Sequence, residues 1–239
     1  SEKISNLFST ENIITDFAMR YGNPSIKSKI HKLHEMGCEN LVILPLYPQY
    51  AAATTATVCD EVYRTLMKMR WQPSLKIIPH YESDPLYIDA LVNSINKKIN
   101  EISWKPDLII ASYHGIPKKY FDKGDPYHCY CHKTTRLISE KFKEINIKTT
   151  FQSRFGPEEW LQPYTDKTLE NLPKEGKKNI LVICPGFASD CVETLEEIII
   201  EGKESFLENG GEKFDVVPCL NDSDHHIKLL EHLVKRHFV

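Results

Sequence analysis

Short unbroken hydrophobic runs alternate along the chain with segments whose apolar residues recur every three or four positions. Such runs are typical of strands covered on both faces, and the periodic segments are typical of helices with one buried face. Strands are expected at residues 41–44, 75–78, 108–111, 148–152, 180–184 and 214–217. Regular alternation of strand and helix predicts crossover connections, and therefore parallel sheets of the α/β class.

Helix boundaries are clearest in the first periodic segment. It follows Asn23-Pro24-Ser25, carries Ile26, Ile30 and Leu33 on one face, and stops at Gly37. Serine before a helix and glycine after it are the expected start and stop signals. The last periodic segment, with Leu229 and Leu233, predicts a closing carboxy-terminal helix.

A domain boundary is expected near residues 101–106, where one helical pattern ends and a new strand begins. The chain has 239 residues, which is long enough for two α/β lobes. We therefore expect a first lobe over residues 1–101 and a second lobe over residues 102–221.

Composition narrows the class of protein. The net charge is −3 and the lysines are scattered among acids, so nucleic acid is not an expected partner. No apolar run approaches the roughly 20 residues that span a bilayer, although peripheral membrane contact stays open. Seven cysteines without a recognisable signal peptide indicate reduced thiols and a cytoplasmic location. The chain opens with Ser1 and begins within an α/β unit, so upstream sequence is expected to be missing.

A histidine follows one of the predicted strands. In Ser112-Tyr113-His114-Gly115-Ile116-Pro117, His114 lies at the carboxyl end of a strand, where parallel sheets bind ligands. Taken by itself, His114 could equally well be a structural histidine that only forms a hydrogen bond to the backbone of a turn.

Three glutamates follow another strand. Glu193, Glu197 and Glu201 are spaced four apart, which places them along one side of a helix. Alone, this row is best interpreted as a solvated face. Both segments leave the same edge of a parallel sheet, however, and imidazole with carboxylate suits Fe(II). A pair of His114 and Glu193 could bind a metal or act as a base.

Two cysteines, Cys129 and Cys131, lie between His128 and His132. The C-x-C spacing has no second nearby pair, so it does not make a complete zinc or iron–sulfur framework. We interpret these residues as ordinary reduced thiols.

Several motifs occur together in an order that resembles the ferrochelatase family over essentially the whole chain. The motifs are Met19-Arg20-Tyr21, Leu46-Tyr47-Pro48-Gln49-Tyr50 with Thr54-Thr55, Ser112-Tyr113-His114-Gly115-Ile116-Pro117, Gly124-Asp125-Pro126-Tyr127, Gln152-Ser153-Arg154, Trp160-Leu161 and Phe187-Ala188-Ser189-Asp190 with Glu193-Thr194-Leu195. No single motif decides the matter; their shared order does.

The resemblance implies two doubly wound, Rossmann-like lobes with a porphyrin cleft, in which residues 222–239 complete the first lobe. It implies that His114 is the active-site histidine and Glu193 its acidic partner. It also implies that Glu197 and Glu201 continue an acidic metal path on a π-type helix. The porphyrin-binding residues implied by it are Arg20, Tyr21, Tyr127, Trp160 and Phe187.

The reaction implied is the insertion of Fe(II), as a substrate, into protoporphyrin IX or coproporphyrin III, with release of two protons in haem biosynthesis. No organic cofactor is expected. The alternatives are a chelatase for another metal and a non-catalytic protein that binds tetrapyrrole or metal. The oligomeric state is left open, and peripheral contact would be with the inner membrane.

Three features depart from the family pattern. Cys191 stands where many members have a histidine, the family's amino-terminal strand and loop are absent, and no cysteine-bearing extension follows Phe238. The last departure predicts that there is no [2Fe-2S] cluster. The absence of the amino-terminal strand and loop raises the question of whether these 239 residues are active without that segment.

Overall fold

The computed structural model describes residues 2–238, which divide into two compact units. The first unit contains the residues up to His80 together with those from Asp222 onward, and the second contains Tyr81–Asn221. Each unit has its own parallel sheet.

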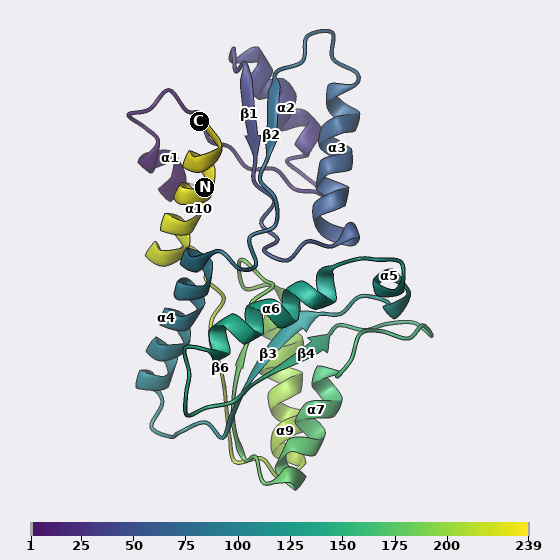
Figure 1. Cartoon of the computed structure of the whole chain (residues 1–239), viewed down its shortest axis with the longest axis vertical. Helices are drawn as coiled ribbons and strands as arrows, with labels where there is room; N and C mark the ends of the chain where they lie inside the picture. The colour runs from purple at the N-terminus through teal and green to yellow at the C-terminus, as the bar shows by residue number, and fades with distance from the viewer. Residues whose placement is uncertain (1, 239) are drawn as a thin grey trace. The chain divides into compact units, whose positions relative to one another are not determined.

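The first unit is built on a two-stranded parallel sheet, shown in the upper part of Figure 1. Strand β1 (Asn40–Ile43) pairs with β2 (Ser74–Ile77), so that Asn40 lies opposite Ser74 and Ile43 opposite Ile77. The helices of this unit are α1 (Glu2–Leu7), α2 (Ile26–Glu35), the π-helix η1 (Ala52–Ala56), α3 (Thr57–Leu66) and α10 (Asp224–Phe238). Helix α2 packs against α3, whereas α10 packs against β1 and α1.

Both predicted ends of α2 are present. The Ser25 hydroxyl accepts the backbone N–H of Ser28 at 3.1 Å. Gly37 adopts a φ of 83°, and the Gly37 and Cys38 N–H groups donate to the carbonyls of His34 and Leu33. These two hydrogen bonds satisfy carbonyls at the helix end. They require a residue in the left-handed conformation, which explains the glycine. The apolar face of α2 enters a core with β1 and α3.

The second unit is a doubly wound four-stranded parallel sheet with strand order β4-β3-β5-β6. Its strands are β3 (Leu108–His114), β4 (Ile147–Gln152), β5 (Asn179–Ile183) and β6 (Lys213–Val216). Its helices are α4 (Pro85–Glu101), α5 (Lys118–Asp122), α6 (Tyr127–Ser139), α7 (Thr165–Asn171), the 3-10 helix η2 (Leu172–Glu175), α8 (Val192–Thr194), the π-helix η3 (Leu195–Gly202) and α9 (Lys203–Glu208).

Helices cover both faces of this sheet. Leu108, Ile110, Ile180 and Val182 pack with Phe206 and other residues of α7, η2, η3 and α9 on one face. Helices α4 and α6 pack against each other, and α6 crosses the strands on the other face (Figure 1). The two central strands are almost completely buried, which explains why they appear in the sequence as unbroken hydrophobic runs.

All six predicted strands are present. Five of them begin or end one residue from the predicted limits, and β3 continues three residues further, through His114. The predicted His114 loop therefore begins as strand.

The expected domain boundary differs from the observed division by one helix. Helix α4 belongs to the second unit, where the Tyr87 hydroxyl donates to the Pro185 carbonyl and Lys98 pairs with Asp215 at 3.0 Å. The sequence shows where a helix ends but not which sheet the helix packs on. At the other boundary, the change falls between Asn221 and Asp222, so α10 belongs to the first unit.

Across residues 2–238, none of the helices combines the length and the apolar character that crossing a membrane requires.

Candidate active site around His114 and Glu193

His114 is the last residue of β3, next to Gln152 of β4. Its Nδ1 donates to the Gly115 carbonyl at 2.7 Å, because a carbonyl can only accept. In a neutral imidazole, a proton on Nδ1 leaves the lone pair on Nε2. The side chain is half-buried, so this nitrogen is available as a base or a metal ligand.

The backbone after His114 is held closely. The Gly115 N–H donates to the Gln152 carbonyl at 2.7 Å, and the Leu161 N–H donates to the Ile116 carbonyl at 3.0 Å. A Cβ atom on Gly115 would lie 2.9 Å from the Gln152 carbonyl and 3.1 Å from the Trp160 ring. Only glycine fits this position without a shift of the backbone.

The glutamate segment begins with a capped turn. The Cys191 N–H donates to the Thr194 hydroxyl at 2.9 Å, and the Cys191 side chain accepts the Thr194 N–H, which completes a capping box. Burial and the neighbouring Glu193 raise the pKa of the Cys191 thiol, so this thiol stays protonated. Cys191, a departure from the family pattern, thus has a local structural role.

The pKa of Glu193 lies below its usual value. The main cause is a hydrogen bond from its own backbone N–H, followed by one from the Cys191 thiol. Burial opposes the shift, and attraction to His114 adds to it. His114 and Glu193 are therefore close enough to interact electrostatically across the carboxyl end of the sheet.

The remaining glutamates lie on the π-helix η3, the distorted type of helix that the family resemblance implies. The Ser153 hydroxyl donates to Oε2 of Glu197 at 2.7 Å, and Glu197 is half-buried. Glu201 is exposed. The acids thus extend from a held carboxylate at Glu193 to a solvated one at Glu201.

Gln152 joins the two halves of this site, a role that sequence reasoning missed. Its Nε2 donates to the Glu193 carbonyl at 2.8 Å, and its Oε1 accepts the Ser112 hydroxyl at 2.7 Å. Its own carbonyl holds Gly115, as described above. The side chain is 5% exposed, so these bonds are made away from water. The sequence offers two signals, a polar residue at the end of a predicted strand and its place in the Gln152-Ser153-Arg154 motif, and neither identifies the partners of Gln152.

The aromatic residues predicted to bind porphyrin occupy different environments. The Phe187 ring centroid lies 6.4 Å from that of His114, and Phe187 is half-buried. Tyr127 and Trp160 are each 7% exposed. The Trp160 indole donates to the Phe155 carbonyl at 3.0 Å, and burial raises the pKa of Tyr127 well above its usual value. The Trp160 ring packs closely against Gly115 in the His114 loop.

Arg20 and Tyr21 belong to the first unit and are described by themselves. The Arg20 guanidinium carbon lies 4.4 Å from the Tyr21 ring centroid, over the ring face. The Arg20 Nε is buried and has no hydrogen-bond partner among residues 2–238, while Tyr21 is 71% exposed.

The predicted metal residues do not form a closed cage. Within the described part of the chain, no group of three or more His, Cys, Asp and Glu side chains is arranged to hold a metal ion. His114 and Glu193 interact, Glu197 is bound to Ser153, and Glu201 faces solvent. Any metal at His114 and Glu193 would keep open coordination positions.

The fold defines the class of protein. The solved structure of SirB from Bacillus subtilis with Fe3+ superposes with a TM-score of 0.71 over 98% of this chain and 86% of that one, at 10% identity. A sirohydrochlorin chelatase SirB with cobalt, from Bacillus subtilis subspecies spizizenii, gives a TM-score of 0.70 at 8% identity. The chain therefore has the chelatase fold.

Sequence comparison identifies the family. The ferrochelatase family model matches residues 1–238. The ferrochelatase of Rhizobium meliloti is 59% identical over 94% of this chain and 67% of its own length. The ferrochelatase of Allorhizobium ampelinum is 57% identical over 99% of this chain and 70% of its own length. The chain belongs to the ferrochelatase family, and it spans about two thirds of the length of these relatives.

Proposed function

We propose that His114 and Glu193 form the metallation centre of this ferrochelatase. Family membership makes the chain a lyase of haem biosynthesis that inserts Fe(II) into a porphyrin and releases two protons. The observation that carries the assignment is the link made by Gln152, whose Nε2 donates to the Glu193 carbonyl at 2.8 Å and whose own carbonyl accepts the N–H of Gly115, next to His114.

The His114 imidazole accepts the two pyrrole protons one after the other in this proposal, because Nε2 has a single lone pair and must pass the first proton to the neighbouring acids before it takes the second. Porphyrin must lose two N–H protons when its four nitrogens bind the metal, and the Nε2 lone pair is positioned by the Nδ1 bond to Gly115. The same nitrogen is a ligand for Fe(II) before transfer. The carboxylate of Glu193 stabilises the imidazolium that proton transfer creates.

The acids along η3 conduct iron or protons between solvent and His114. The three carboxylates become more firmly held by hydrogen bonds from Glu201 through Glu197 to Glu193. Glu201 is exposed, Glu197 is half-buried, and Glu193 has a lowered pKa. The open ligand set suits a metal that is a substrate, because Fe(II) must leave these side chains for the porphyrin.

The porphyrin contacts in this proposal combine aromatic and cationic residues. Phe187 beside His114 contacts the ring, and Tyr127 and Trp160 support that surface from the interior. Arg20 pairs with a propionate, and Tyr21 contacts the ring. The buried Arg20 Nε without a partner supports a role for this guanidinium in binding an anion.

The remaining assignments complete the proposal. The porphyrin is protoporphyrin IX or coproporphyrin III, and neither an organic cofactor nor a [2Fe-2S] cluster takes part. The reaction takes place in the cytoplasm, a location that seven free thiols support. Membrane contact, if made, is peripheral.

The test is replacement of the imidazole. His114→Ala should lower Fe(II) or Zn(II) insertion by at least about 100-fold, because it removes both base and ligand. Insertion is followed by the absorbance change of protoporphyrin and, in parallel, of coproporphyrin. His225→Ala, which removes an exposed imidazole of α10, is the matched control. Turnover retained by His114→Ala with an unchanged circular dichroism spectrum would refute the assignment.

A further inference from the structure

Helix α6 carries two histidines one turn apart that the proposed metallation centre does not use. His128 and His132 are four residues apart and therefore lie on one side of the helix. Their ring centroids are 4.4 Å apart and their planes are inclined by 51°. The two imidazoles are in contact.

Aromatic neighbours fix the orientation of the pair. The His128 ring stacks on Phe151 of β4 at 5.7 Å and contacts Phe121 at 5.0 Å. The His132 ring lies 6.2 Å from Phe151. Because both imidazoles rest against the same phenyl ring, little side-chain freedom remains to be lost when a ligand binds.

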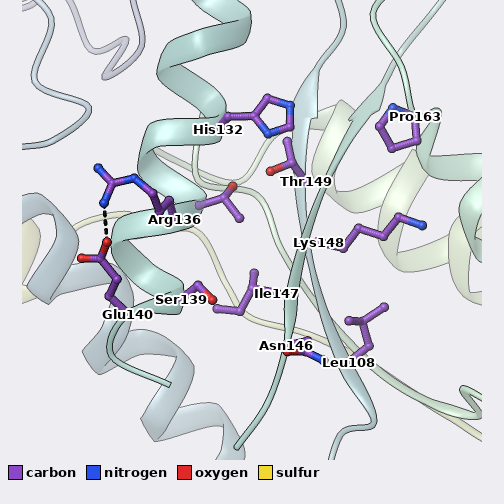
Figure 2. A pocket seen from close by; sticks show the side chains of 11 residues that line it. Leu108, His132, Arg136, Ser139, Glu140, Asn146, Ile147, Lys148, Thr149 and Pro163 are labelled. Atoms are coloured by element: carbon purple, nitrogen blue, oxygen red, sulfur yellow. Dashed lines mark hydrogen bonds and ion pairs between the residues drawn. The ribbon is translucent and has the colours of Figure 1, made fainter. Parts of the chain in front are cut away.

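The pair is open to solvent on its outer side. His132 is exposed and lies beside Thr149 at one end of a hollow between α6 and β4, which has a volume of about 650 Å³ (Figure 2). His128 is half-buried. Neither ring makes a hydrogen bond or ion pair with any residue from 2 to 238, so each keeps a free nitrogen.

Both rings are available as neutral ligands near pH 7. Burial lowers the pKa of His128, and burial together with the charge of His128 lowers the pKa of His132. A metal ion therefore does not compete with protons at these nitrogens.

We propose that His128 and His132 form a two-imidazole site for a divalent first-row transition metal, completed by water. A tetrahedral Zn²⁺ bound by both imidazoles at the usual Zn–N distance holds the ring centroids about 5.2 Å apart. The observed separation of 4.4 Å is within about 1 Å of this value. Binding thus needs the two rings to rotate and move slightly apart.

The ligand chemistry determines which metals bind and how. Imidazole suits Zn²⁺, Cu²⁺ and Ni²⁺, whereas Mg²⁺ and Ca²⁺ prefer oxygen. Among residues 2–238, no third His, Cys, Asp or Glu completes a cluster here, so the metal keeps water ligands and exchanges readily. The spacing of Cys129 and Cys131 does not make a complete cysteine framework at this position, and the proposed site uses the histidines instead.

The test is a Zn²⁺ titration of the full chain with histidines labelled with ¹⁵N in the ring, followed by nuclear magnetic resonance. The signals of His128 and His132 are assigned from His128→Gln and His132→Gln. Both signals should shift at the same Zn²⁺ concentrations. Loss of one ligand should raise the concentration that the other ring needs by at least about tenfold.

The matched control is the double variant His225→Gln/His232→Gln, which removes two exposed imidazoles of α10 that are seven residues apart. It should leave the His128 and His132 response unchanged. The amide spectrum of each variant reports folding, and His132→Gln alters an exposed side chain. Two rings that respond at different Zn²⁺ concentrations, or a His128 response that His132→Gln leaves unchanged, would overturn the proposal.

Discussion

The segment after β3 and the segment after β5 supply the two halves of the metallation site, and they are held in place differently. After β3, His114 is still part of a strand, and the next residue packs backbone against backbone with Gln152. After β5, the acids are carried by a three-residue helix and a π-helix that are fixed largely by side-chain hydrogen bonds.

This difference matches the two proposed roles, which are proton acceptance by His114 and conduction of metal or protons by the glutamates. A general base must be held in place to within a fraction of an ångström, and a sheet end provides that rigidity. A row of carboxylates that passes a metal along must release it at each step, and a helix with exposed acids allows that. The first segment should therefore tolerate substitution poorly and the second segment well.

Gly115→Ala should produce the largest effect on stability. The new Cβ would meet the Gln152 carbonyl at 2.9 Å, and a backbone atom cannot move aside easily. We expect a loss of up to about 3 kcal/mol in the free energy of unfolding, the usual cost of overpacking. Urea denaturation measures the loss. A shift of His114 should reduce metal insertion as well, and an unchanged midpoint with full activity would contradict the rigid strand end.

Gln152→Leu should have the next largest effect, because it separates the two segments. The leucine has a similar volume but leaves the Glu193 carbonyl without its donor at 2.8 Å. Loss of the donor to this partly buried carbonyl should cost about 1 kcal/mol in urea denaturation.

The control for this experiment is Gln152→Glu, which keeps an acceptor for Ser112 but cannot donate when ionised. If the donor bond to the Glu193 carbonyl matters, both variants should slow metal insertion. If Gln152→Leu loses activity and Gln152→Glu keeps it, the effect is due to the lost hydrogen bond from Ser112 instead.

Sequence reasoning could predict the strands because hydrophobic burial decides where they lie. All six runs became strands, and the start of α2 after Ser25 and its end at Gly37 follow from local capping chemistry. The assignment of α4 to the second unit could not be predicted in this way. It depends on contacts of Tyr87 and Lys98 with residues about a hundred positions later in the chain.

The same distinction applies to the site. His114 and the glutamates could be chosen from their positions after strands, and their π-helix was implied by family resemblance. Gln152 could not be recognised as the link, because its partners Ser112 and Glu193 come from segments on either side of it in the sequence. The His128 and His132 pair was visible as spacing, but the ring contact with Phe151 was not.

Glu193 should make a smaller, pH-dependent contribution to stability. Its pKa is lowered in the folded chain, so folding favours the carboxylate over the protonated acid. The contribution is complete above the unfolded pKa of about 4.3 and is lost as the pH falls through the lower folded pKa. The difference between the wild type and Glu193→Gln should therefore shrink below that pH.

Because Glu193 is partly exposed, this pH-dependent difference should stay below about 1 kcal/mol. Denaturation of both proteins at pH values from 7 to 3.5 measures it. A difference that stays constant over this range would show that the hydrogen bonds to the carboxylate do not stabilise the folded chain.

Gly202→Ala should have the smallest effect and gives the sharpest contrast with Gly115→Ala. The new Cβ at the end of η3 would lie 3.1 Å from the Glu197 carbonyl and 3.2 Å from a methyl group of Leu169. These contacts are tight, but the leucine side chain can move, and alanine in a helix gains about 0.5 to 1 kcal/mol over glycine. The two terms nearly cancel, so urea denaturation should show a change within about 0.5 kcal/mol. A destabilisation as large as that of Gly115→Ala would mean that the carboxylate segment is held as rigidly as the strand end.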